Sequence, residues 1–159
     1  MIWKPELTVA AVVEQQGRFL IVEERVARRL VFNQPAGHVE EGEDLLHAVV
    51  RETLEETAWR FQPQAIVGIY LWKNPANEKS FLRVAYTGIA DHHDPRRPLD
   101  HAILRVHWLT REQLLGREAR LRSPMVLRCV ADYLAGTRMP LDLLTHLPFE
   151  QVEARAAVL

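Results

Sequence analysis

The chain has 159 residues, 48% of them hydrophobic and 26% charged, which fits one globular domain over residues 1–159 and excludes a disordered or fibrous protein. Twenty Lys and Arg against 21 Asp and Glu leave a net charge of −1, so a dedicated nucleic-acid-binding protein is not expected. The single cysteine, Cys129, excludes a disulfide framework and a multi-cysteine zinc site. No apolar run approaches the roughly 18 residues that cross a bilayer, and the N-terminus lacks a signal-peptide pattern. We therefore expect a cytoplasmic protein that does not bind membranes.

The first predicted elements are two strands. Residues 7–13 and 18–23 are rich in β-branched and large apolar residues, and the Gln-Gln-Gly sequence between them predicts that they form a hairpin. Residues 33–37 predict a loop, because they contain Pro35 and Gly37.

The main predicted helix spans residues 43–57, a segment without Gly or Pro. Leu46, Val50 and Leu54 recur at a spacing of four residues. This spacing predicts that the three side chains form the apolar face of the helix.

Later segments predict further strands and helices. Three strands are expected over residues 65–72, 81–89 and 103–109. Thr110 and Gln113 have the spacing of a capping box and begin a short helix. Ser123-Pro124 begins a further helix that runs to about residue 135. Residues 150–159 are expected to be weakly ordered. Strands on both sides of one well-marked helix predict a mixed α/β fold.

A dense acidic stripe lies on the main helix. Glu52, Glu55 and Glu56 are three and four residues apart, so they share one side of the helix, which we expect to face away from the apolar residues. Like charges at this spacing repel one another. The stripe is either a solvated acidic surface or a cation site, and oxygen-only ligands favour Mg²⁺ or Mn²⁺.

The spacing of the acids across residues 37–59 is more specific than their number. It resembles the Nudix box, G-x5-E-x7-R-E-U-x-E-E-x-G-U, in which U is a bulky aliphatic residue. The six matching positions are Gly37, Glu43, Arg51, Glu52, Glu55 and Glu56. Two positions depart from the pattern: Thr53 stands at an aliphatic position and Ala58 replaces the closing glycine. An alanine there is strained if the position requires a positive φ.

The resemblance implies an α/β/α sandwich with a mixed β-sheet and a metal-dependent hydrolase. By position, Glu52, Glu55 and Glu56 look like catalytic metal ligands, with the Gly37 carbonyl as a fourth. Arg51 resembles the arginine that orients these carboxylates, and Glu43 resembles a brace of the loop. Mg²⁺ is the implied cofactor, with Mn²⁺ as a substitute, because such an ion neutralises phosphate oxygens and activates water.

Segments outside the box resemble one group of phosphatases within this family, over residues 32–40 and 121–124 and in overall length. That resemblance implies hydrolysis of nucleoside di- and triphosphates, or of a pyrophosphorylated pyrimidine of the thiamine pathway, with release of phosphate. Two alternatives stay open. One is an ADP-ribose-type pyrophosphatase that releases AMP, and the other is a non-catalytic domain that senses nucleotides. The implied partner is a small nucleotide or pyrophosphate, bound by a monomer or a homodimer.

Four residues outside the box are candidates for the substrate or the metal. Arg28 and Arg29 could bind anions, and Trp72 could stack on a base, which contributes about 1–3 kcal/mol. Asp100 lies in the loop before residues 103–109, where the family often has a further carboxylate ligand or base. Each residue also has a structural explanation, as a solvated charge, a core aromatic or a plain loop acid.

Overall fold

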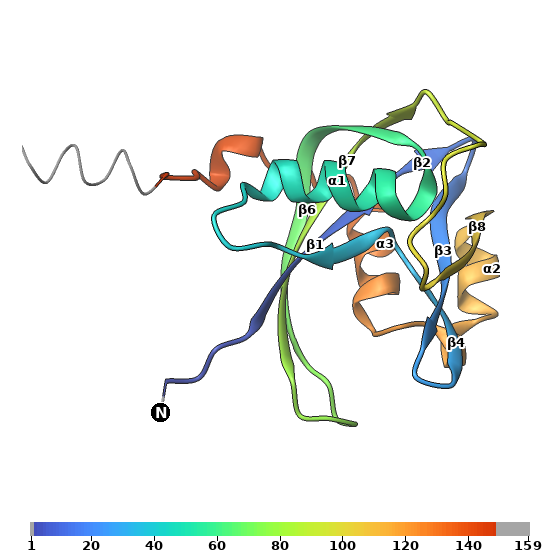
Figure 1. Cartoon of the computed structure of the whole chain (residues 1–159), viewed down its shortest axis with the longest axis horizontal. Helices are drawn as coiled ribbons and strands as arrows, with labels where there is room; N and C mark the ends of the chain where they lie inside the picture. The colour runs from blue at the N-terminus through green and yellow to red at the C-terminus, as the bar shows by residue number, and fades with distance from the viewer. Residues whose placement is uncertain (1, 149–159) are drawn as a thin grey trace, which may run out of the picture.

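The structure is a computed structural model that describes residues 2–148 (Figure 1). Its strands are β1 (Glu6–Val12), β2 (Glu14–Gln15), β3 (Arg18–Val26), β4 (Arg29–Asn33), β5 (Ala36–His38), β6 (Arg60–Lys73), β7 (Ser80–Asp91) and β8 (Ile103–Leu109). Its helices are α1 (Leu45–Thr57), α2 (Arg111–Leu115) and α3 (Met125–Leu134), with short 3₁₀ helices η1 (Glu118–Arg120) and η2 (Leu141–Leu143). The weakly ordered tail expected over residues 150–159 lies outside the described residues.

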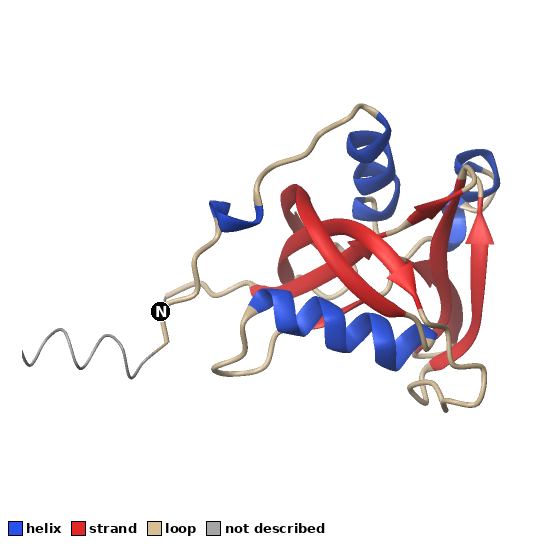
Figure 2. Ribbon diagram, turned by 90° about the horizontal axis from the view of Figure 1, so that it is seen from above, coloured by secondary structure: helices blue, strands red, loops and turns tan. Residues whose placement is uncertain are grey.

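The strands form two sheets of four strands each. The first has the order β5-β1-β7-β6 and is mixed, because β1 and β7 are parallel while the other neighbours are antiparallel. The second is antiparallel, with β2, β4 and β8 all paired to β3. Figure 2 shows helices on both sides of the strands. The α/β/α fold class predicted from the sequence is therefore confirmed, with the strands divided between two sheets.

Alternation along β1 explains the two layers of core. Val9 and Ala11 pack on the side of α1, whereas Ala10 and Val12 pack with residues of α2 and α3. Successive side chains of a strand point to opposite faces, so the apolar run of β1 is buried on both sides. Within residues 2–148, no helix is long and apolar enough to span a membrane.

The predicted hairpin between residues 7–13 and 18–23 is wrong in its pairing. β1 lies between β5 and β7, which occupy both of its edges, so β3 cannot pair with it. Only the short β2 forms a hairpin with β3, where Glu14 pairs with Phe19. The loop predicted over residues 33–37 is also shorter than expected. Asn33 ends β4, and Ala36 already pairs with Ala10 of β1.

Helix α1 buries a different face from the predicted one. Its buried residues include Leu45, Ala48, Val49 and Thr53, whereas Leu46, Val50 and Leu54 are only half-buried. Glu56, one turn after Thr53, lies on the same buried face and accepts a hydrogen bond from the backbone of β5. Thr53 fits this buried face because its hydroxyl donates to the Val49 carbonyl at 2.7 Å.

The end of α1 depends on a left-handed residue. Ala58 has φ 60° and ψ 13°, and its N–H donates to the Leu54 carbonyl. A non-glycine residue in this region costs roughly 1–2 kcal/mol. Ala58, which replaces the closing glycine of the motif, therefore adopts a backbone conformation that favours glycine.

We expect Ala58→Gly to stabilise the protein by about 0.5–1 kcal/mol, because the relief of backbone strain exceeds the loss of one buried methyl group, which is about 0.8 kcal/mol. Ala135→Gly is the matched control, because Ala135 ends α3 with φ −69° and is exposed. It should destabilise the protein by about 0.5–1 kcal/mol. Urea unfolding midpoints measure both changes. Equal destabilisation by the two substitutions would show that Ala58 carries no strain.

Candidate active site

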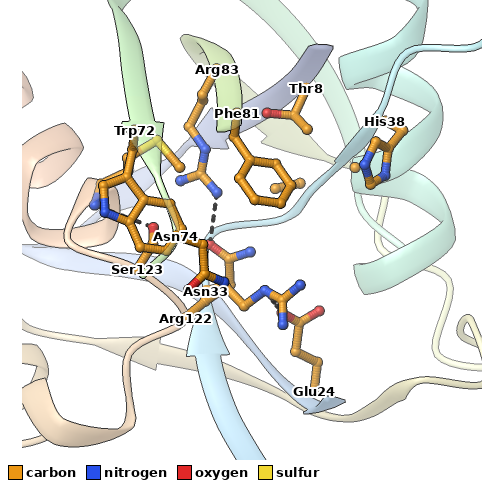
Figure 3. Close-up of a pocket in the computed structure, with 13 residues that line it drawn as sticks. Thr8, Glu24, Asn33, His38, Trp72, Asn74, Phe81, Arg83, Arg122 and Ser123 are labelled. Atoms are coloured by element: carbon orange, nitrogen blue, oxygen red, sulfur yellow. Dashed lines mark hydrogen bonds and ion pairs between the residues drawn. The ribbon is translucent and has the colours of Figure 1, made fainter. Parts of the chain in front are cut away.

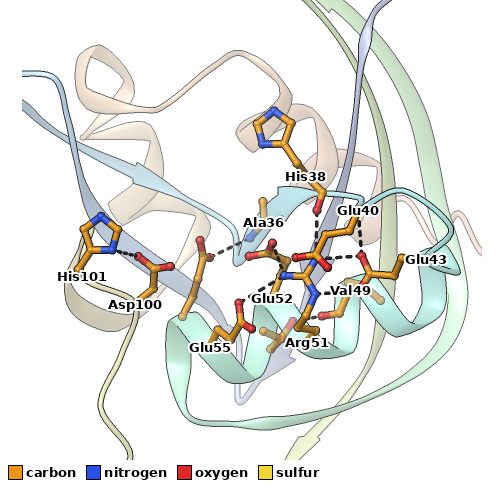
Figure 4. Close-up of polar contacts among 12 residues, drawn as sticks. Ala36, His38, Glu40, Glu43, Val49, Arg51, Glu52, Glu55, Asp100 and His101 are labelled. Atoms are coloured by element: carbon orange, nitrogen blue, oxygen red, sulfur yellow. Dashed lines mark hydrogen bonds and ion pairs between the residues drawn. The ribbon is translucent and has the colours of Figure 1, made fainter.

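Arg51 is the central cation of the acidic cluster (Figure 4). Its Nε and Nη2 donate to the two carboxylate oxygens of Glu43 at 2.8 and 3.0 Å. Nη1 donates to Glu52 at 2.8 Å and to Glu55 at 3.3 Å, and Nη2 also donates to the His38 carbonyl at 3.1 Å. The Arg51 guanidinium thus lowers the pKa of the Glu43 carboxyl. The geometry fits the bracing roles expected of both residues.

The three helix glutamates differ in burial. The Glu56 side chain lies inside the protein, at 7% residue exposure, and its Oε2 accepts from the Ala36 N–H at 2.9 Å. The Glu52 side chain is 14% exposed and that of Glu55 is 40% exposed. The prediction that all three glutamates face solvent is therefore wrong for Glu56. Its carboxylate lies on the side of α1 that faces β5, where the Ala36 N–H donates to it.

Burial of these carboxylates shifts their titration. Desolvation raises the pKa of Glu56 well above its ordinary value, and the charges of Glu24, Glu52 and Asp100 raise it further. Desolvation also raises the pKa of Glu52, although Arg51 acts in the opposite direction. Ionisation of Glu56 and Glu52 is therefore disfavoured first by burial and then by the neighbouring acids.

Gly37 allows strand β5 to approach α1 closely. A Cβ atom at Gly37 would overlap the carboxylate of Glu52. Gly37 has no positive φ, so a side chain at this position would act by displacing the Glu52 carboxylate from its contact with Arg51. Across residues 2–148, no three acidic, histidine or cysteine side chains already surround one point as a complete ligand set. Arg51 holds Glu52 and Glu55, while the Ala36 N–H holds Glu56.

Two further carboxylates lie near the helix glutamates. Asp100 sits beside the end of α1, where its N–H donates to the Glu55 carbonyl at 2.8 Å (Figure 4). Glu24 comes from β3, and burial raises the pKa of its carboxyl. Sequence reasoning proposed Asp100 but missed Glu24. The available signal was an acidic pair, Glu23-Glu24, directly after the apolar run of β3.

A pocket of about 180 Å³ opens beside this cluster (Figure 3). Ala36 and Gly37 line it at the side of the acidic cluster, and Trp72, Arg83 and Arg122 line it elsewhere. Trp72, proposed from the sequence as a residue that stacks on a base, therefore lines a pocket, and its role stays a prediction.

The two arginines proposed from the sequence to bind anions do not line this pocket. Arg28 and Arg29 are exposed at the turn between β3 and β4, and neither lines this pocket. Arg83 and Arg122 are the arginines that do so. They come from segments distant in the sequence, which explains why spacing gave no signal for them.

We expect Glu56→Gln to raise the melting temperature of the metal-free protein at pH 8. A carboxyl group whose pKa is raised on folding stabilises the fold while it is protonated, and this contribution is lost as the pH rises through the folded-state pKa. The amide has no charge to desolvate, and its oxygen can still accept from the Ala36 N–H. An increase of about 2–4 °C corresponds to about 1 kcal/mol in a domain of this size.

The difference should shrink as the pH falls and vanish at about pH 3, where the carboxyl of wild type is protonated in both the folded and unfolded states. Thermal melts in EDTA across this pH range measure it. Glu55→Gln serves as the control and should change the melting temperature less, because the Glu55 side chain is 40% exposed. A Glu56→Gln variant that melts below wild type at pH 8 would contradict the prediction.

Comparison with known proteins places this geometry in a family. A family model described as NUDIX domain matches residues 4–129. The phosphatase NudJ of Escherichia coli (strain K12) is 37% identical over 142 residues, which cover 89% of this chain and 92% of that protein. NudJ of Shigella sonnei has the same identity and coverage.

Solved structures agree with the sequence relatives. A NUDIX hydrolase from Nitrosomonas europaea has a TM-score of 0.88 and 42% identity, covering 91% of this chain and 98% of that chain. The NUDIX domain of Shewanella oneidensis NrtR complexed with ADP ribose has a TM-score of 0.67 and 18% identity, covering 84% and 90%. The second likeness concerns the fold alone.

Proposed function

The chain belongs to the NUDIX family as a hydrolase of acid anhydrides in phosphorus-containing compounds, and we propose that its reaction depends on Mg²⁺, or on Mn²⁺ in its place. The proposed substrates are nucleoside di- and triphosphates or related pyrophosphorylated small molecules, such as the pyrimidine pyrophosphate of the thiamine pathway. Phosphate is the proposed product. The likeness to phosphatase NudJ over 89% of the chain supports this substrate class.

The main support for the proposal is that the pocket lies beside the acidic cluster. Ala36 and Gly37 line it, and the same two residues contact the carboxylates of Glu56 and Glu52. A substrate in the pocket therefore has its phosphoanhydride next to the acidic cluster. Trp72 also lines the pocket, whereas the exposed Arg28 and Arg29 lie outside it.

The donor set fits a hard divalent cation. Glu52, Glu55 and Glu56, with the Gly37 carbonyl, are oxygen ligands of the kind that Mg²⁺ and Mn²⁺ prefer. The raised pKa of the buried Glu56 carboxyl supports the assignment, because a bound cation would compensate its charge. When bound, such an ion neutralises phosphate oxygens and lowers the pKa of water.

The residues of the chain have separate tasks in the proposed hydrolysis. Arg51 orients Glu52 and Glu55, and Glu43 holds Arg51. Asp100 is the proposed base that accepts a proton from the attacking water, or a further ligand. In the reaction the oxygen of water bonds to one phosphorus atom while the bridging P–O bond breaks. The bridging oxygen leaves with the other phosphate, and the protons of water pass to the base and to the products.

A product assay tests the function. Purified full-length protein with Mg²⁺ should release phosphate from nucleoside di- or triphosphates or from pyrimidine pyrophosphates. Glu56→Gln keeps the shape of the side chain but removes its charge, so we expect turnover to fall by at least about 10²-fold. Dominant release of AMP from ADP-ribose would favour the pyrophosphatase alternative. Tight nucleotide binding without turnover would favour the sensor alternative.

A thermal assay tests the metal site without any substrate. Millimolar Mn²⁺ should raise the melting temperature, because a ligand present at a hundredfold excess over its Kd stabilises the native state by about 2.7 kcal/mol. Substitution of Glu52, Glu55 and Glu56 together by Gln should abolish this rise. Glu41→Gln is the control and should keep it, because Glu41 is an exposed acid of the preceding loop. An equal Mn²⁺ shift in wild type and the triple variant would assign the acids to a solvated surface.

A further inference from the structure

Arg83 is a buried cation without an acidic partner. It lies on β7, it is 4% exposed, and it lines the pocket (Figure 3). Nη1 donates to the Gln34 side-chain oxygen at 3.1 Å and Nη2 to the Asn33 side-chain oxygen at 3.2 Å, and both acceptors are neutral. Nε has no partner, and no carboxylate of residues 2–148 lies within 4.0 Å of the guanidinium. Buried charges are seldom left in this condition without a ligand.

Other features at the same end of the pocket are also electropositive. Arg122 lines it with a side chain that is 39% exposed, and its Nε lies 3.7 Å from Glu24. Glu24 also lines the pocket, and its carboxylate forms an ion pair with Arg122 but none with Arg83. Ser123 and Met125 bring the first turn of α3 to the pocket, and the N-terminal end of a helix carries a partial positive charge. Ser123 also offers a hydroxyl group to a ligand.

We propose that this end of the pocket, formed by Arg83, Arg122 and Ser123, is a phosphate subsite separate from the carboxylate cluster. We assign the bound group on the basis of the proposed function. In that reaction, the subsite holds the terminal phosphoryl group of the substrate. Ala36 and Gly37, which contact the carboxylates of Glu56 and Glu52, line the same pocket. One phosphate at Arg83 therefore places the adjoining anhydride beside the carboxylates, and the group held at Arg83 is released as phosphate.

A nucleobase fits this end of the pocket less well. It would bring no negative charge to Arg83. In addition, Trp72 and Phe81 already stack on each other, with ring centroids 6.0 Å apart and planes 24° apart, so the space between them is filled. A phosphate offers several anionic oxygens, which suit the free donors of a guanidinium and a hydroxyl group.

Binding of inorganic phosphate in EDTA tests the subsite without metal or turnover. Isothermal titration at constant ionic strength should detect phosphate binding to the wild-type full chain. Arg122→Gln should weaken it by at least about tenfold, the loss that follows removal of one charge-assisted hydrogen bond. Arg120→Gln is the matched control. Like Arg122, Arg120 is a partly exposed arginine that pairs with a β3 glutamate, here Glu23 at 3.2 Å, but it does not line the pocket.

Two further variants separate this subsite from the carboxylate cluster. Arg83→Gln should abolish phosphate binding, while Glu52→Gln should keep it. If Arg83→Gln does not fold, the Arg122 and Arg120 pair decides the outcome. Absence of phosphate binding to wild type, or equal binding by the Arg122→Gln and Arg120→Gln variants, would overturn the subsite.

The failure of the subsite is distinguishable from the failure of the proposed function. Phosphate binding in EDTA requires no hydrolysis, so it can be found in a protein that proves inactive. In an active protein, Arg122→Gln should lower kcat/KM for a nucleoside triphosphate and raise the share of pyrophosphate among the products. Binding of an unphosphorylated nucleoside that is lost in Trp72→Ala and kept in Arg122→Gln would place the base in the pocket instead and overturn the proposal.

Discussion

The acidic cluster between β5 and α1 contains four carboxylates and one guanidinium, that of Arg51. The arrangement of the cluster depends on the hydrogen bonds that Arg51 donates. Arg51 joins the loop through Glu43, the helix through Glu52 and Glu55, and the strand through the His38 carbonyl. Repulsion among the acids would otherwise favour separation of these three segments. Because Glu43 provides two hydrogen bonds to the guanidinium, Arg51 is fixed in one orientation, and the helix carboxylates are fixed with it.

Gln34 has a comparable role on the other side of the pocket. It is 1% exposed, and it accepts from Arg83 of β7 while its amide donates to the Val126 carbonyl of α3 at 2.8 Å. A single buried amide thus connects the mixed sheet with the helix on the opposite side from α1. Immediately after it, the Pro35 carbonyl accepts from the Ala11 N–H at 2.9 Å, which brings the chain to β1 before β5 begins. The short segment between β4 and β5 therefore links the two sheets and shapes the pocket.

Local signals in the sequence predicted most of the elements but not their pairing. The strand at residues 103–109 and the capping box at Thr110 and Gln113 agree with the structure, because both depend on adjacent residues. The hairpin prediction failed because the neighbours of β1 come from distant parts of the chain. The buried face of α1 was misassigned because a glutamate was treated as an exposed residue, whereas a backbone N–H of β5 makes its burial possible.

The same distinction holds for the candidate site. The Arg51 and Glu43 contacts could be expected from the spacing of the motif, since the helix and its preceding loop are contiguous in sequence. Glu24, Arg83 and Arg122 could not, because they come from β3, β7 and the segment before α3. Each looks like an ordinary strand or surface residue in the sequence. Only the pairing of the strands brings them to one pocket.

The loop between β7 and β8 is fastened to the end of α1. The Asp100 N–H donates to the Glu55 carbonyl at 2.8 Å, and the Asp94 N–H donates to the Ala58 carbonyl at 3.1 Å. These carbonyls lie at the C-terminal end of the helix, where the backbone has no partner of its own. A protease cut or an inserted residue in this loop would therefore loosen the last turn of α1, although that turn lies more than thirty residues earlier in the chain. The loop is thus a poor place for a tag or a circular permutation, despite its exposed side chains.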